Sequence, residues 1–446
     1  MNRILLKDAL LATPSRIIRE DLLIEGNLIT KIDHDISSEG VKVIDCHELL
    51  VLPGLIDEHV HFREPGMTQK ATIYSESRAA VRGGVTSYLD MPNNNPPCLD
   101  EDALNFKKAI ASRDSVANYG FYLGASADNL EAVKSIDPKK YAALKIFMGS
   151  TTGNLLLDDL TSLAKVFLNA RTLICTHCED SAIIHANEEK AYKTYGEDVP
   201  FSMHRIIRNT DACVESTKLA IELAKESGAR LHLMHLSTAK EVEMLREFMF
   251  GNCKTRQISG EAVIPHIYFS ECDYESLGGF LKCNPAVKTE QDRLAILKGL
   301  EDGVITTIGT DHAPHELSAK TGNYKHCASG IPSVQYSLLA LLDLWKRGEL
   351  SLETIIKATS QNVAERYRIK GRGRIEEGYF ADLALVNPLK PHTVTYEDIE
   401  SKCGFSPFLN HTFACSLEHT IVNGNIVVEN GQLADTAVGM PLEFDR

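Results

Sequence analysis

Two histidines one residue apart close an apolar run in the stretch Gly54-Leu-Ile-Asp57-Glu-His59-Val-His61. Side chains alternate across a β-strand, so His59 and His61 would share one face and could chelate a divalent metal ion. A His-x-His pair on its own more often binds nothing. This pair is informative because four further apolar runs also end in residues of ligand type.

Those four runs place a polar residue where each of them stops. One strand with a terminal histidine is ordinary, but five runs of this kind over roughly 250 residues are hard to assign to chance. We therefore expect five strands whose ends meet at one active-site face. The four additional terminal residues are Lys145, His177, His235 and Asp311.

Strand-like and helix-like segments alternate through the middle of the chain. Three more strands are expected at Val85–Asp90, Asn118–Leu123 and, with a weaker pattern, Thr255–Glu261, while Thr210–Ser227 and Thr238–Phe248 have helical periodicity. Eight strand–helix units predict a (β/α)8 barrel of the TIM type over residues 53–365. In such barrels the functional residues lie at the carboxyl ends of the strands.

Both ends of the chain are predicted to be β-rich. Leu23–Ile29 reads as a hairpin around Gly26-Asn27, and Thr420–Val428 contains the Asn423-Gly424 pair that favours a tight turn with positive φ angles. We expect residues 1–52 and 366–446 to build one smaller domain that is discontinuous in sequence.

The six candidate ligands suit two metal ions that share a bridge, and zinc accepts both imidazole and carboxylate ligands. A protonated lysine is a poor ligand, with a usual pKa near ~10.4. A neutral Lys145 can instead add carbon dioxide, and the carbamate offers one oxygen to each metal. The alternative is a lysine at the barrel rim that extends its amine into water.

Asp311 could bind metal, act as a general acid and base, or do both. His312 would point away from Asp311 if the strand continues, which favours a structural role. His315 follows Pro314 in the next loop and could contact a substrate at the barrel mouth.

Bulk composition narrows the class of protein. A net charge of -14 argues against a general partner of nucleic acid or anionic membranes. Eleven cysteines without framework spacing indicate a reducing, cytoplasmic location, and Cys175 and Cys178 are interpreted as buried strand residues. No apolar run approaches the ~18 residues of a membrane span.

Over nearly its whole length the sequence resembles the amidohydrolase superfamily and, within it, the dihydroorotase family. Arg63 and Asn93 are the elements that distinguish this family from hydantoinase and allantoinase relatives. The motifs that carry the resemblance are Asp57-Glu-His59-Val-His61-Phe-Arg63-Glu-Pro-Gly66, Asp90-Met-Pro-Asn93, Asn284-Pro285 and Thr310-Asp311-His312-Ala-Pro-His315.

The resemblance implies a β-sandwich beside the barrel and two zinc ions per subunit, bridged by carboxylated Lys145 and a hydroxide. It also implies reversible cyclisation of N-carbamoyl-L-aspartate to L-dihydroorotate in pyrimidine biosynthesis. By motif position, one zinc would be held by His59, His61 and Asp311, and the other by His177 and His235. Arg63, Asn93 and His315 would take the substrate carboxylate, and Asn284 the ring amide.

Two rival interpretations remain at this point. A related hydrolase of hydantoins, dihydropyrimidines or allantoin would use the same metals, but a neutral ring would give Arg63 no partner. A non-catalytic scaffold usually loses metal ligands, and none of the expected six is missing here. The sequence leaves open the oligomeric state, with a homodimer as one option, the docking of other pathway enzymes, the conformation of the 316–330 loop, and the roles of Glu261 and His266.

Overall fold

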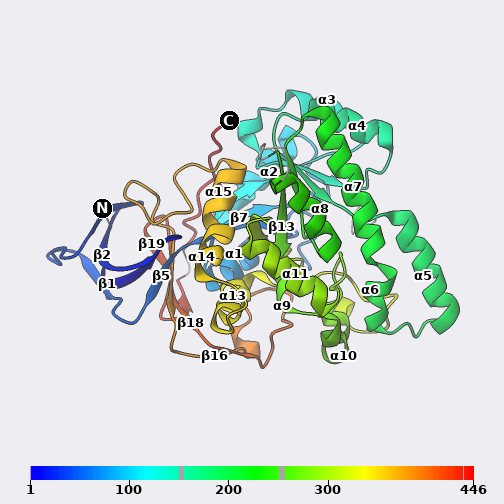
Figure 1. The fold of residues 1–446 in the computed structure, drawn as a ribbon. Coiled ribbons are helices and arrows are strands. Elements are labelled where there is room, and N and C mark those ends of the chain that lie inside the picture. The colour runs from blue at the N-terminus through cyan, green and yellow to red at the C-terminus, as the bar shows by residue number, and fades with distance from the viewer. Residues whose placement is uncertain (1, 150–154, 251–256, 435) are drawn as a thin grey trace.

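The computed structural model describes residues 2–149, 155–250, 257–434 and 436–446. Eight parallel strands with helices around them form a closed barrel, beside which lies a sheet of strands from both chain termini (Figure 1). The predicted combination of a (β/α)8 barrel and a smaller β domain is therefore confirmed. No helix in these ranges is long and apolar enough to cross a membrane.

The barrel strands are short and buried on both faces, which is why they read as continuous apolar runs in the sequence. The third strand is interrupted at Tyr122, so that β8 pairs with β7 and β9 pairs with β10. The strands are β6 (Leu55–Val60), β7 (Val85–Asp90), β8 (Asn118–Phe121) with β9 (Leu123–Gly124), β10 (Leu144–Phe147), β11 (Ile174–His177), β12 (Leu231–Leu233), β13 (Ile258–Val263) and β14 (Thr307–Gly309).

The barrel closes between its first and last strands. The amide of His61 donates to the carbonyl of His312 at 2.8 Å, and the amide of His312 donates to the carbonyl of His59 at 3.3 Å. The last strand, β14, is shorter than the run from Val304 to Asp311 suggests. Asp311 has a φ of 47°, so the backbone leaves strand geometry at the residue predicted to be functional.

The outer helices begin and end where local sequence signals predict. The predicted helix Thr210–Ser227 is α7 (Thr210–Ser227), capped by the Asn209 side chain at one end and by Gly228 with φ 73° at the other. The other long helices are α1 (Ile73–Arg82), α2 (Glu101–Asp114), α4 (Leu160–Asn169), α5 (Ser181–Tyr195), α8 (Ala239–Phe250), α11 (Glu290–Glu301) and α13 (Ser337–Lys346).

Strands from both termini form one nine-stranded mixed sheet around a second apolar core. In Figure 1 the blue N-terminal strands lie beside the orange and red C-terminal ones. β5 and β15 join the two halves in antiparallel register, with Val51 opposite Leu385. The strands are β1 (Arg3–Ala12), β2 (Ile17–Glu25), β3 (Leu28–Asp33), β4 (Lys42–Asp45), β5 (Leu50–Pro53), β15 (Leu383–Asn387), β18 (Ser416–Val422), β19 (Asn425–Glu429) and β20 (Gln432–Leu433).

Both predicted hairpins are confirmed, as β2–β3 and β18–β19. In the second, Asn423 and Gly424 have φ angles of 49° and 70°, as a primed turn requires. The proposed domain limits, 53–365 for the barrel and 1–52 with 366–446 for the β domain, remain our proposal. Of the weak seventh run, Thr255 and Arg256 lie outside the described residues.

Gly424 offers a test of how the two terminal segments fit together. A Cβ atom there would lie 2.0 Å from the carbonyl oxygen of Gly26, whereas one at Gly404, with nearly the same φ of 69°, would meet open space. Gly404→Ala should lose about 1 kcal/mol of unfolding free energy, the usual cost of a left-handed backbone. Gly424→Ala should lose distinctly more in urea denaturation. Equal losses would show that the contact between the hairpins can relax.

Candidate metal centre and active site

The carboxyl ends of the barrel strands surround a pocket. Of the residues predicted to act in metal or substrate binding, all except Asn93 and His315 contribute to its lining. Phe147, Ala313, Ser329 and Gly330 complete the wall. The lining residues are His59, His61, Arg63, Lys145, Phe147, His177, His235, Asn284, Asp311, Ala313, Ser329 and Gly330.

One side of the pocket carries three ligand atoms within 4.8 Å of one another, from His59, His61 and Asp311. Asp311 Oδ1 lies 3.3 Å from His59 Nε2 and 3.1 Å from His61 Nε2. Burial raises the pKa of Asp311, but the two imidazoles outweigh it and hold that pKa below its usual range. An ionised carboxylate beside two buried imidazoles is a donor set that suits a divalent cation.

Hydrogen bonds fix which nitrogen each of these two histidines presents to the pocket. His59 Nδ1 lies 2.9 Å from Glu261 Oε2, and His61 Nδ1 lies 2.8 Å from Asn93 Oδ1. Each Nδ1 therefore carries its hydrogen toward an oxygen, which leaves Nε2 with a lone pair directed at Asp311. Such outer hydrogen bonds set the tautomer and the basicity of histidine ligands.

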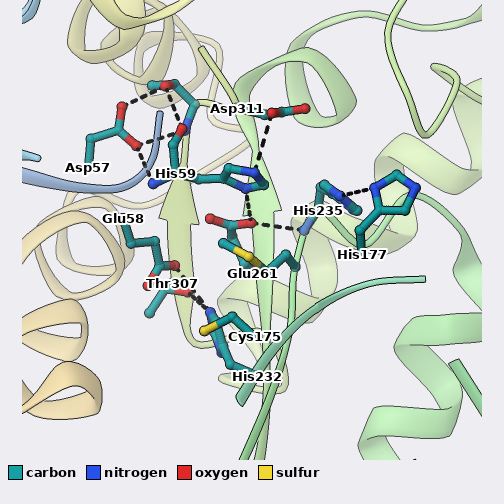
Figure 2. A network of polar contacts seen from close by, with 12 residues as sticks. Asp57, Glu58, His59, Cys175, His177, His232, His235, Glu261, Thr307 and Asp311 are labelled. Atoms are coloured by element: carbon teal, nitrogen blue, oxygen red, sulfur yellow. Dashed lines mark hydrogen bonds and ion pairs between the residues drawn. The ribbon is translucent and has the colours of Figure 1, made fainter. Parts of the chain in front are cut away.

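Glu261 connects this half of the site to the other (Figure 2). The same Oε2 that faces His59 also accepts the backbone amide of His235 at 2.9 Å, and Glu261 is fully buried on β13. His235 has a φ of 40°, an unfavourable conformation for a residue with a Cβ. One carboxylate thus orients a histidine on β6 and holds the strained turn after β12.

The second half of the site contains two imidazole nitrogens that face each other. His177 Nδ1 lies 2.9 Å from His235 Nε2, and burial lowers the pKa of both residues. Two neutral rings in this arrangement share at most one hydrogen, whereas a cation between them would accept both lone pairs. His177 Nε2 lies 3.1 Å from Glu179 Oε2, and Glu179 in turn pairs with Arg208.

Lys145 lies on β10, lines the same pocket and is fully buried, which excludes a lysine that reaches water at the rim. Its Nζ lies 3.0 Å from Met234 Sδ. No carboxylate of the described residues is within ion-pair distance. Burial lowers the pKa of Lys145, which favours the neutral amine. The donor set of His59, His61 and Asp311 therefore fits a divalent metal ion, and the predicted carboxylation of Lys145 stays a prediction.

Arg63 lines the pocket, and His315 contacts it without being one of the lining residues. Arg63 is 3% exposed, donates from Nε to the carbonyl of Pro314 at 3.0 Å, and has Nη2 at 3.3 Å from His315 Nε2. Burial lowers the pKa of Arg63 to about 10, which leaves it protonated at neutral pH. Burial, together with the charge of Arg63, lowers the pKa of His315 to about 2, so this ring is neutral.

The two asparagines differ in what they offer to a ligand. Asn284 lines the pocket, and its Oδ1 is buried without a hydrogen-bond partner among the described residues. Asn93 uses its Oδ1 on His61 and does not line the pocket. The predicted contacts of Asn284 with a ring amide and of Asn93 with a carboxylate stay predictions.

Several residues near the site were given no catalytic or binding role from the sequence. Glu261 and Glu179 each contact the ring of a predicted histidine ligand. The only sequence feature that could have indicated this role is an acidic residue at or just after the end of an expected strand. His312 Nε2 lies 2.8 Å from Glu76 Oε2, away from the pocket, in agreement with the predicted structural role. His266 Nε2 lies 3.0 Å from the carbonyl of Pro285.

Comparison with known proteins identifies the family. The family model described as Amidohydrolase family matches residues 50–427. The chain belongs to the amidohydrolase family. It is 32% identical to a dihydroorotase of Methanosphaera stadtmanae, over 93% of this chain and 94% of that protein, and 29% identical to an allantoinase of Desulfitobacterium hafniense, over 98% of each.

Solved structures of other members share the fold of this amidohydrolase. The L-hydantoinase of Arthrobacter aurescens superposes with a TM-score of 0.92 at 23% identity, over 99% of this chain and all of that one. The dihydropyrimidinase of Brevibacillus agri gives 0.90 at 24% identity, over the full length of both. These two likenesses show that the chain shares its fold with an L-hydantoinase and a dihydropyrimidinase.

The position of Glu261 predicts an effect on metal binding. Glu261→Gln should weaken metal binding about 10–100-fold, because outer carboxylates that orient histidine ligands typically contribute that much. Chelator competition with elemental analysis measures it. Glu241→Gln is the matched control, since Glu241 is also buried but accepts hydrogen bonds from Thr238 and Ser237. Equal metal affinity in the two variants would contradict the role of Glu261.

Proposed function

We propose that the protein is a zinc-dependent dihydroorotase, which interconverts N-carbamoyl-L-aspartate and L-dihydroorotate in pyrimidine biosynthesis. The observation that carries the proposal is the buried guanidinium of Arg63 in the pocket wall. No carboxylate of the described residues lies within ion-pair distance of it. An ionised group buried without a partner costs several kcal/mol, so an anion supplied by the substrate is the natural complement.

The identity of the ring follows from that requirement. Dihydroorotate carries a carboxylate, whereas dihydrouracil, hydantoin and allantoin have none. Arginine offers a planar fork of donors that matches a carboxylate, and Nη1 of Arg63 makes no hydrogen bond to any described residue. His315 beside it and Asn284 in the pocket lining are the proposed further contacts of the substrate.

The six predicted ligands would hold the metals in the two halves described above. His59, His61 and Asp311 would bind one ion, His177 and His235 the other, and carboxylated Lys145 would bridge them. When bound, two divalent ions would polarise the ring carbonyl and make a water molecule more acidic. Two observations support this assignment. The ring nitrogens of the four histidines lie close together in two groups, and the buried amine of Lys145 lines the same pocket.

Asp311 acts as the general base and then as the general acid in this proposal. In the hydrolytic direction it takes a proton from the attacking water and then passes that proton to the departing ring nitrogen. Ring closure reverses the two transfers. Asp311 is ionised at neutral pH, because the two imidazoles hold its pKa below the usual range, and an ionised carboxylate is the form that the first transfer requires.

Removing the proton carrier gives one test. Asp311→Asn should keep at least one metal ion, because four histidines remain. It should lose about 10²–10⁴-fold or more in turnover, since an amide cannot shuttle the proton. Steady-state kinetics in both directions, combined with elemental analysis, measures the two effects. Near-normal turnover in both directions would assign the proton transfer to another group or to solvent.

Substrate choice gives the decisive test of the proposed function. Charge-assisted hydrogen bonds contribute roughly 1.5–3 kcal/mol each, so a neutral ring should be disfavoured about a thousandfold in kcat/KM. Arg63→Met should reduce dihydroorotate hydrolysis by a similar factor while both metals stay bound. Comparable wild-type efficiency on dihydrouracil, hydantoin or allantoin would overturn the proposal in favour of another cyclic amidohydrolase. Absence of turnover on every ring would favour a scaffold.

A further inference from the structure

Two residues of the segment 316–330, Ser329 and Gly330, form part of the pocket wall. The carbonyl of Ser329 also lies 3.0 Å from His315 Nε2, so the segment contacts one of the proposed substrate-binding side chains. Apart from the short helix α12 (Leu317–Lys320), the segment has no regular secondary structure to hold it in place. Its position must therefore come from other contacts.

Lys320 supplies one set of these contacts. It is 2% exposed, and its Nζ donates to the carbonyls of Lys282 at 3.1 Å, Ala328 at 2.8 Å and Gly330 at 2.8 Å. Three acceptors around one amine use all three hydrogens of an ammonium group. Burial lowers the pKa of Lys320 to about 8, which leaves the ammonium as the main form at neutral pH.

Lys282, which lies outside the segment, supplies a second set of contacts. Its Nζ donates to the carbonyls of Tyr324 at 2.6 Å and Cys327 at 2.7 Å. Its own carbonyl accepts the amide of Gly330 at 2.8 Å in addition to the amine of Lys320. The two lysines are thus joined through one carbonyl.

Neither ammonium has a carboxylate within ion-pair distance in the part of the chain that the structure describes. Backbone carbonyls take the place of a counter-ion. The contacts of Lys282 with Tyr324 and Cys327, and that of Lys320 with the carbonyl of Lys282, form only while the segment lies against Lys282. Two other lysines show the contrast: buried Lys107 pairs with Asp90, whereas Lys325 on the same segment is exposed.

We propose that Lys282 and Lys320 are positioning residues that hold the segment 316–330 against the pocket and thereby determine substrate affinity. The identity of the substrate in this inference rests on the proposed function, but the holding of the segment does not. If a variant keeps the segment in place only one tenth of the time, the apparent affinity for substrate falls tenfold. The chemical step on bound substrate is affected less.

Lys320→Met tests the proposal against Lys325→Met, which removes the same charge from the same segment without touching these carbonyls. In hydrogen–deuterium exchange of the metal-loaded protein, the amides of Ala328 and Gly330 should exchange at least tenfold faster in Lys320→Met. They should exchange at the wild-type rate in Lys325→Met, and amides of β7 should be unchanged in both. The KM for dihydroorotate should rise about tenfold or more in Lys320→Met, with kcat changed less and metal content unchanged.

A second pair of variants distinguishes a local effect on the segment from unfolding of the whole protein. Lys282→Met should show the same local exchange and the same rise in KM, and Lys320→Arg, which keeps a charged donor, should recover part of both. Wild-type exchange at Ala328 and Gly330 in both methionine variants would overturn the proposal. So would faster exchange throughout the barrel, which would indicate only a structural role. If exchange responds locally but dihydroorotate is not a substrate, the proposed function fails and the positioning role stands.

Discussion

Positive charge buried without a carboxylate partner is the constraint on which the rest of the active site depends. Lys145 is fully buried and Arg63 is 3% exposed, and each would cost several kcal/mol if it stayed charged and unmatched. Lys145 can lose its proton and become a carbamate between two metals, while Arg63 must receive an anion from outside. The same feature recurs at Lys282 and Lys320, where backbone carbonyl groups supply the partner.

Strained backbone at the ends of the barrel strands accompanies this arrangement. Arg63, His235 and Asp311 have φ angles of 67°, 40° and 47°, and such conformations cost about 1–3 kcal/mol each in residues with side chains. The barrel core and the hydrogen bond from the amide of His235 to Glu261 offset part of that cost. The strain turns these side chains toward the pocket.

Much of this architecture could be predicted because local sequence patterns determine it. Buried parallel strands give continuous apolar runs, the Asn423-Gly424 pair sets its own turn, and polar residues in or just after such runs identify Lys145, His177 and His235 as neighbours. The roles of Glu261 and Glu179 could not be predicted, because they depend on which histidine nitrogen lies opposite in three dimensions. The break at Tyr122 and the carbonyl contacts of Lys320 leave no pattern in the sequence either.

The fold itself does not decide the substrate, because a hydantoinase of the same architecture superposes with a TM-score of 0.92 at 23% identity. Substrate choice depends on which groups neutralise the buried charges of Arg63 and Lys145. A crystal structure of the zinc-loaded protein with bound dihydroorotate would show these groups directly. We predict two metal ions, a carboxylated Lys145 between them, and the substrate carboxylate within hydrogen-bond distance of Arg63. An unmodified lysine amine beside two occupied metal sites, or a substrate carboxylate directed away from Arg63, would contradict this account.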